Sequence, residues 1–291
     1  MRDMRFGVNT WLWTSPFDSG ALGLFGKIRD MGFHVVEIPV EEPGFIKPAE
    51  VRTALEVYGL EPVIIGAFGR DRDLSSDDAA VRRNGMDYIR SCLAIGEALG
   101  ARVFAGPAYS AVGKARSLPD AARKAEWDRA VAGVREAGAM AADYGLMLAL
   151  EPLNRFESDM VNNTEDVVRF IGEVDHPAVG IALDGFHMHI EEANIEAAIR
   201  RAGKHLMHVQ VSESHRGIPG TGQFDWAGLR RGLEAVRYRG AVSIESFSPG
   251  CGTLAEAVCI WKPLAESQDK FAEQGLRFLE RWASDGAKGN N

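Results

Sequence analysis

The sequence predicts an α/β fold in the form of a single (β/α)8 TIM barrel that spans residues 1–291. Eight apolar, strand-like runs alternate with eight longer amphipathic segments, and eight parallel strands are the number that closes into a barrel. Four of these runs end on a residue that can bind a cation, at intervals of 26 to 35 residues, about one strand–helix unit. The main rival, an open doubly wound sheet, would normally show a Gly-rich phosphate turn after its first strand, and VNTWLWTSPF contains none.

The elements of this barrel follow in chain order from the spacing of apolar residues. The expected strands are 6–10, 34–40, 61–67, 102–106, 146–151, 179–184, 206–211 and 242–246. Apolar residues spaced three and four apart indicate helices that pack on a sheet, at 19–31, 48–58, 78–99, 121–144, 164–174, 191–202, 225–237 and 269–283. Gly59 and Gly145 follow the second and fourth helices, where a C-cap glycine belongs, and Thr164 opens the fifth. A short tail from about residue 285 is expected to fray.

Composition excludes several classes of protein. With 46% hydrophobic and 25% charged residues, the chain is ordinary globular material that can bury one large core. A formal net charge of −8 without a basic stripe argues against nucleic acid as a partner. No long uncharged apolar run and no apolar leader occur, so neither membrane spanning nor secretion is expected. Cys92, Cys251 and Cys259 are too few for a disulfide framework and indicate free thiols in a reducing cytoplasm.

Carboxylates stand at the ends of three expected strands: Glu151 in ALEPLNRFE, Asp184 in IALDGFHMHIEE and Glu245 in VSIES. A lone glutamate at a strand end is more often a salt-bridged structural residue, but here three strands share the pattern. Because the carboxyl ends of barrel strands open onto one face, these groups should converge. Three carboxylates at one point repel unless a cation neutralises them. The sequence therefore predicts a divalent metal site in the barrel mouth, with Glu157 in the adjacent loop.

The ligand from the seventh strand has two candidates. His208 and Gln210 are two residues apart and therefore point to the same face of the strand. Imidazole is the commoner ligand in general, whereas Gln210 lies nearer the carboxyl end of the strand. Arg216 follows in a Gly/Pro-rich loop, where a guanidinium can grip sugar oxygens or an enediolate. His187, three residues after Asp184, is expected to reach into the mouth.

The rim of the barrel is expected to carry aromatic residues and one further carboxylate. Aromatic residues that follow the strands are expected to cover the apolar face of a sugar, and they are Trp11, Trp13, Phe17, Phe68 and Tyr109. Glu37, near the end of the second strand, is a further candidate for the rim. The chain has no nucleophile elbow, no dinucleotide-binding fingerprint and no HExxH motif.

The motifs LEPLNRFE, LDGFHMHIEE, SESHRGIPGTG and IESF resemble those of the xylose-isomerase-like TIM barrels, and most closely those of the ketose 3-epimerases that act on D-tagatose, D-allulose or L-ribulose. The resemblance runs through most of the chain. It implies one divalent metal ion bound by Glu151, Asp184, Gln210 and Glu245, with His208 as the substitute for Gln210. Mn²⁺ is the expected metal, and Mg²⁺ or Co²⁺ are alternatives.

By the same resemblance, the reaction is metal-dependent epimerisation of a free keto-sugar at C3 through a cis-enediolate. Glu151 and Glu245 form the acid/base pair, and Glu157, His187 and Arg216 hold the ketose around O1 to O3. The enzyme is expected to be a cytoplasmic homodimer or homotetramer with neither nucleic-acid nor membrane partners.

Two departures from the family pattern keep other reactions open. The pattern normally has histidine where Gln210 stands and threonine where Gly185 stands. Hydroxypyruvate isomerases are similar in using glutamine at that metal position, so an isomerase of hydroxypyruvate or of aldoses and ketoses is one alternative. A subunit that cleaves 3-keto C-glycosides together with a second, different subunit is another. A non-catalytic sugar-binding barrel is the third, and the motifs do not specify the preferred sugar.

Overall fold

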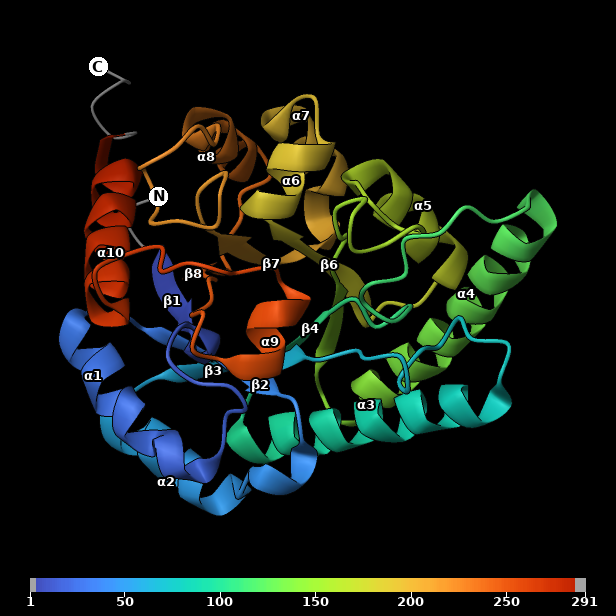
Figure 1. Ribbon diagram of the computed structural model, residues 1–291, viewed down its shortest axis with the longest axis horizontal. Coiled ribbons are helices and arrows are strands. Elements are labelled where there is room, and N and C mark those ends of the chain that lie inside the picture. The colour runs from blue at the N-terminus through green and yellow to red at the C-terminus, as the bar shows by residue number, and fades with distance from the viewer. Residues whose placement is uncertain (1–3, 286–291) are drawn as a thin grey trace.

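The computed structural model describes residues 4–285, and the tail expected from about residue 285 lies almost entirely outside them. Eight parallel strands close into a barrel in chain order, with helices around the outside (Figure 1). The predicted (β/α)8 barrel is therefore confirmed. The strands are β1 (Arg5–Asn9), β2 (Val35–Val40), β3 (Glu61–Gly66), β4 (Val103–Gly106), β5 (Met147–Leu150), β6 (Val179–Asp184), β7 (Leu206–Val211) and β8 (Ala241–Ile244).

The helices return the chain from the end of one strand to the start of the next. They are α1 (Gly23–Met31), α2 (Pro48–Tyr58), α3 (Ala79–Leu99), α4 (Asp120–Asp143), α5 (Thr164–Val174), α6 (Gly185–Glu191), α7 (Ile195–Ala202), α8 (Trp226–Ala235), α9 (Gly252–Ala257) and α10 (Gln268–Asp285). Among residues 4–285, no helix is both long and apolar enough to cross a membrane.

The strands are apolar because both of their faces are covered. β2 and β6 are buried at every position, as is typical of parallel strands between a helical layer and a barrel interior. Inside the barrel, Ala149 and Ala182 lie two residues before Glu151 and Asp184 and thus on the same faces of their strands. These small side chains leave room for the polar groups above them.

The register brings polar residues of neighbouring strands together. Asn9 of β1 lies beside Glu37 of β2, and Asp184 of β6 lies beside Gln210 of β7. Because all strands run in the same direction, the groups at their carboxyl ends gather at one mouth of the barrel.

The structure differs from the sequence prediction mainly after β6 and β8. The expected helix 191–202 begins only at Ile195, as α7, and Asn194 caps it by accepting from the backbone N–H of Ala197. Helix α6 before it was not predicted, and Asp184 accepts a hydrogen bond from the backbone N–H of Phe186 at its start. The fifth helix is capped by Asn163, one residue before the predicted Thr164. Helix α9 was not predicted, and it lies in front of the strands in Figure 1.

Candidate active site

A cavity of about 580 Å³ opens at the carboxyl ends of the strands. Its lining includes five of the residues predicted for the site, which are Glu151, Glu157, His187, Arg216 and Glu245. Asp184 is 1% exposed and lies behind this lining, in contact range of His187. The structure therefore brings together the predicted carboxylates and the predicted sugar-binding groups, although they come from four separate segments of the chain.

The aromatic residues predicted for the rim divide into two groups. Trp11 and Phe68 line the cavity, together with Phe247 after β8. The other three do not line it, because their side chains are used elsewhere. The indole of Trp13 donates to Asp269, Phe17 is fully buried against Phe25, and the hydroxyl of Tyr109 donates to the backbone oxygen of Glu151.

His187 is oriented by a backbone hydrogen bond, with its Nε2 turned toward two carboxylates. The backbone N–H of Asn154 donates to its Nδ1 at 3.1 Å, so the neutral ring carries its proton on Nε2. That Nε2 lies 3.6 Å from Glu151 Oε1 and 3.9 Å from Asp184 Oδ2. Ligand atoms of these three residues lie within 4.8 Å of one another. Because Nε2 carries the hydrogen, His187 is better suited to donate to an oxygen than to bind a metal.

Arg216 provides the positive charge of the site. Its guanidinium pairs with Asp184, and Nη1 lies 3.2 Å from Glu245 Oε2. The same group lies over the Phe186 ring, 4.2 Å from the centroid, so one side of it faces an aromatic surface. Burial would lower the pKa of Arg216, but Asp184 and Glu245 outweigh burial and raise it. The guanidinium therefore stays charged at any working pH.

The loop that carries Arg216 is organised by a buried carboxylate that sequence reasoning missed. Glu213 Oε1 accepts from the backbone N–H of Gly220 and the indole of Trp226, while Oε2 accepts from the backbone N–H groups of Ser214 and Phe224. Burial alone would raise the pKa of Glu213, but these hydrogen bonds outweigh it and lower the pKa.

Replacing Glu213 with glutamine should therefore destabilise the fold in a pH-dependent way. The new amide NH₂ would face two donors, each of which costs about 1–3 kcal/mol when left unpaired and buried, so a total loss of roughly 2–6 kcal/mol is expected at pH 7. Because the pKa of Glu213 is lower in the folded state than in the unfolded state, its ionised carboxylate stabilises the fold at pH values above about 4.3, the ordinary pKa of a glutamate. This stabilisation is lost as the pH falls through the pKa that Glu213 has in the folded state. Urea unfolding of both proteins at pH 7 and pH 4 should show the difference shrinking at the lower pH. An equal difference at both values would contradict this account.

Burial and mutual repulsion raise the pKa values of two carboxyls at the mouth. Burial has the largest effect on the pKa of Glu151, and the charges of Glu245 and Asp184 raise it further. Burial likewise raises the pKa of Glu245 to about 8, with Arg216 opposing this and Asp184 and Glu37 adding to it. Raised pKa values in a cleft are typical of groups that exchange protons during catalysis.

Below this cluster lies a second buried polar set. Glu37 is fully buried, which corrects its predicted place on the rim: it is the third residue of β2 and points inward. Its Oε1 contacts His208 Nε2 at 2.5 Å, and its Oε2 accepts from Asn9 Nδ2 at 3.0 Å and from Gln210 Nε2 at 2.8 Å. His208 is thus paired with Glu37. A charged residue within the apolar run VVEIPV is the sequence signal that could have identified this set.

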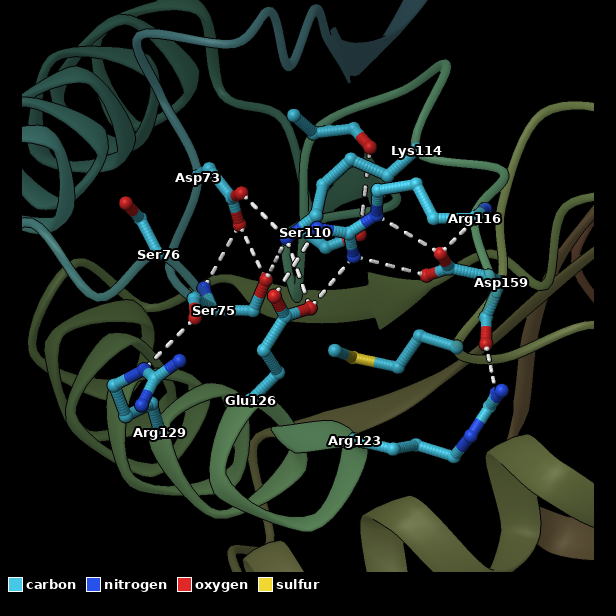
Figure 2. Close-up of polar contacts among 12 residues, drawn as sticks. Asp73, Ser75, Ser76, Ser110, Lys114, Arg116, Arg123, Glu126, Arg129 and Asp159 are labelled. Atoms are coloured by element: carbon cyan, nitrogen blue, oxygen red, sulfur yellow. Dashed lines mark hydrogen bonds and ion pairs between the residues drawn. The ribbon is translucent and has the colours of Figure 1, made fainter. Parts of the chain in front are cut away.

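A network of charges fixes the loops that form one wall of the cavity (Figure 2). Lys114 pairs with Asp73 at 2.7 Å and with Glu126 at 3.2 Å, while Arg116 pairs with Glu126 and with Asp159. These residues come from the loops after β3, β4 and β5 and from α4. Next to the network, the backbone N–H of Gly113 donates to the backbone oxygen of Glu157 at 2.7 Å. The network therefore supports the wall that carries Glu157.

The donor set of the mouth fits a divalent cation. Glu151, Asp184 and Glu245 are 7%, 1% and 4% exposed, and one guanidinium does not balance three carboxylates. Both N–H bonds of the Gln210 amide are used by carboxylates, and no group among residues 4–285 donates a hydrogen bond to its Oε1. Three carboxylates and an amide oxygen would form an all-oxygen donor set of the kind that hard divalent cations prefer.

Comparison with known proteins identifies the family of this chain. Residues 25–282 match the family described as the xylose isomerase-like TIM barrel. The chain belongs to this family. Within it, a ketose 3-epimerase from Arthrobacter globiformis is 31% identical over 279 residues, which cover 95% of this chain and 96% of the relative. These matches confirm the resemblance to the ketose 3-epimerases and the prediction of an isomerase that acts on carbohydrates.

Two further members of the family show how its structures and reactions vary. The crystal structure of D-allulose 3-epimerase from Methylomonas sp. in complex with D-allulose superposes with a TM-score of 0.90 at 29% identity, covering 96% of this chain and 97% of that structure. A 3-dehydro-D-guloside 4-epimerase from Escherichia coli is 32% identical over 235 residues, which cover 79% of this chain and 88% of the relative. The family thus includes epimerases with different substrates.

Proposed function

We propose that this xylose isomerase-like barrel epimerises a free keto-sugar at C3 in a metal-dependent reaction that passes through a cis-enediolate. The observation that carries the proposal is the placement of Glu151 and Glu245 on one cavity, both buried and both with raised pKa values. They follow β5 and β8, which lie three strands apart around the closed barrel. Two carboxyls so placed can approach a bound sugar from different sides.

In this proposal, one glutamate removes the proton from C3 and the other delivers a proton to the opposite face of the same carbon. One glutamate starts as a carboxylate and becomes a carboxylic acid, and the other starts as a carboxylic acid and becomes a carboxylate. Exchange of protons with solvent returns the pair to its starting state before the next turnover in the same direction. A bound divalent cation would act as Lewis acid toward the ketone and adjacent hydroxyl, and Glu151, Asp184, Gln210 and Glu245 would hold it. Mn²⁺ is the metal we propose, with Mg²⁺ or Co²⁺ as alternatives.

The remaining groups of the cavity would orient the sugar. Arg216 and His187 present N–H groups, and Glu157 presents an acceptor, toward the region beside the two glutamates. Asn154 Nδ2 donates to Glu157 Oε1 at 2.7 Å, which leaves the second oxygen of this carboxylate for a sugar hydroxyl. We propose that these three side chains bind the ketose around O1 to O3.

A second candidate function is epimerisation of a 3-keto glycoside at C4. The cavity volume of about 580 Å³ favours it, because cavities of roughly 300–1,000 Å³ typically enclose drug-sized ligands and a single six-carbon sugar is smaller. Leu254 and Val258 of the α9 region extend the apolar wall beyond the carboxylates. The relative that acts on 3-dehydro-D-guloside supports the same reading.

One experiment separates these candidates. The Mn²⁺-loaded protein is incubated with a panel of ketohexoses and ketopentoses and, in parallel, with 3-keto glucosides, and the products are identified by NMR. Inversion at C3 of a free ketose is the expected result. Inversion at C4 of a glycoside alone would favour the second candidate, and no conversion of either class would reject both.

The Arg216→Lys variant should separate sugar orientation from metal binding. Lysine keeps the charge but loses the planar guanidinium, whose Nη1 contacts both Asp184 and Glu245 while its face lies over Phe186, so turnover should fall by at least tenfold, about 1.4 kcal/mol. Metal affinity, measured by calorimetric titration with Mn²⁺, should change little. Unchanged turnover would remove Arg216 from the set of sugar-binding residues.

We also propose a cytoplasmic location and self-association as a homodimer or homotetramer. Three free cysteines, two of them buried, support a reducing compartment. Phe156, beside Glu157, is 71% exposed, and Trp261 is 67% exposed, and large exposed aromatics are typical of protein interfaces. Light scattering of the purified protein would give the oligomeric state directly.

A further inference from the structure

The buried set below the mouth has no direct contact with the cavity. Asn9 and Glu37 are fully buried, His208 is 1% exposed and Gln210 is 2% exposed. None of the four lines the cavity, so none is placed to touch a sugar. Glu37 lies at the centre of the set, because its two oxygens together contact the other three side chains.

Glu37 decides which way the amide of Gln210 points. Gln210 Nε2 donates at 2.8 Å to Glu37 Oε2 and at 2.8 Å to Glu245 Oε1, so both of its hydrogens are used. If the amide were flipped, its oxygen would face two carboxylate oxygens, which are acceptors only when ionised. The carboxylate of Glu37 therefore makes the observed orientation the favourable one. It leaves Oε1 as the atom without a donor among the described residues.

Asn9 strengthens the arrangement from the other side. Its Nδ2 donates to Glu37 Oε2 at 3.0 Å and to Glu245 Oε1 at 3.1 Å, and its own orientation is fixed because Oδ1 accepts from the backbone N–H of Trp11. The amides of Asn9 and Gln210 therefore both donate their hydrogens to Glu37 Oε2 and Glu245 Oε1. Glu245 is in this way held on Oε1 by two N–H donors, while its Oε2 faces Arg216.

We propose that Glu37 is a positioning residue, which fixes the amide of Gln210 so that its oxygen is the atom presented to a divalent cation. The inference rests on the proposed function only through the metal site and does not depend on which sugar is converted. It explains how a neutral glutamine can serve where the family pattern has histidine: an amide binds a metal through oxygen alone, so its orientation must be set by a neighbour. Partners that orient a ligand in this way typically alter metal affinity 10- to 100-fold.

The Glu37→Gln variant tests this directly, because it removes the charge at constant size. Its amide can present its oxygen to the amides of Asn9 and Gln210 only by turning its NH₂ toward His208, and in the other orientation the NH₂ faces both amides donor against donor. In either orientation the negative charge that holds Nε2 of Gln210 is lost. We expect the dissociation constant for Mn²⁺, measured by calorimetry and by electron paramagnetic resonance on the full chain, to rise by roughly 10- to 100-fold. Asp73→Asn is the matched control: it also replaces a buried carboxylate by an amide, within the network of Figure 2, and should leave the affinity for Mn²⁺ at the wild-type value.

A double-mutant cycle then shows whether the effect acts through Gln210. In a Gln210→Ala background, Glu37→Gln should change Mn²⁺ affinity by no more than a few-fold, because there is no amide left to orient. The same large loss in both backgrounds, or wild-type affinity in the single variant, would overturn the inference. If Glu37→Gln does not fold, Glu37→Asp keeps the charge but withdraws it by one methylene, and it should weaken Mn²⁺ binding in the same direction.

These measurements separate failure of the proposed role of Glu37 from failure of the proposed function. Equal Mn²⁺ affinity in wild type and variants overturns the role of Glu37 alone. Mn²⁺ binding that responds as expected, in a protein that converts no sugar, leaves the role of Glu37 standing and rejects the epimerase. A wild-type protein that binds no divalent cation rejects the metal site and this inference together.

Discussion

Replacing either Glu151 or Glu245 with glutamine is expected to lower the rate of epimerisation by roughly two to four orders of magnitude, the usual contribution of general acid–base catalysis. Glutamine keeps the shape of the side chain and an oxygen for the metal, but its amide cannot accept and return a proton. Both carboxyls line the cavity and both have raised pKa values, so each is suited to exchange a proton with a bound sugar. Rates are measured on the ketose that the wild-type protein converts best.

Exchange of the C3 proton distinguishes the loss of one catalytic base from the loss of the folded structure. With one base left, each should still exchange the C3 proton of one epimer with solvent, although interconversion is nearly lost. Glu196→Gln, which makes the same substitution on α7 at a carboxylate that pairs with Arg200 and Arg231 and does not line the cavity, is the matched control and should retain a rate close to that of the wild type. Near wild-type epimerisation by both active-site variants would contradict the assignment of the acid/base pair.

Removal of the divalent metal should have an effect of similar size. Chelation is expected to abolish measurable turnover, and added Mn²⁺ should restore it. Because a ligand that binds only the folded state stabilises it by about 2.7 kcal/mol at 100 times its dissociation constant, saturating Mn²⁺ should also raise the melting temperature. Full activity after exhaustive chelation would contradict the metal site.

Metal binding should also release protons. The pKa of Glu151 is raised, and that of Glu245 lies at about 8, so the metal-free site holds bound protons at neutral pH. A cation bound by these carboxylates favours their ionised forms and expels those protons. Calorimetric titrations in buffers of different ionisation enthalpy would count them, and the number released should fall as the pH rises through 8.

The barrel could be predicted from the sequence because its strands are buried on both faces. Runs such as those of β2 and β6 are apolar nearly throughout, and each ends where the chain turns to a helix. The same property made the carboxylate cluster predictable, since three strands share a carboxylate at their carboxyl ends and these ends meet at one mouth. Helices α6 and α9 were not predicted, because short helices depend on local caps, such as Asp184 at the start of α6, more than on a long apolar stripe.

The arrangement below the mouth could not be predicted in the same way. Glu37 contacts Gln210 across 173 residues of chain, and which atoms meet depends on the register around the closed barrel. The orientation of an amide likewise depends on its neighbours in space. Tyr109 and Trp13 were predicted for the rim because they follow strands, but the hydroxyl of Tyr109 donates to the backbone oxygen of Glu151 and the indole of Trp13 donates to Asp269.

The most direct test of the proposed chemistry follows the C3 proton itself. The Mn²⁺-loaded protein is placed in deuterium oxide with each ketose of the panel, and NMR records deuterium at C3 in substrate and product. Two carboxyls that transfer protons at C3 predict that every product molecule carries solvent deuterium at C3, and that this exchange is lost on the metal-free protein. Conversion of a ketose without deuterium at C3, or no exchange at C3 of any ketose, would contradict the assignment of a C3 epimerase.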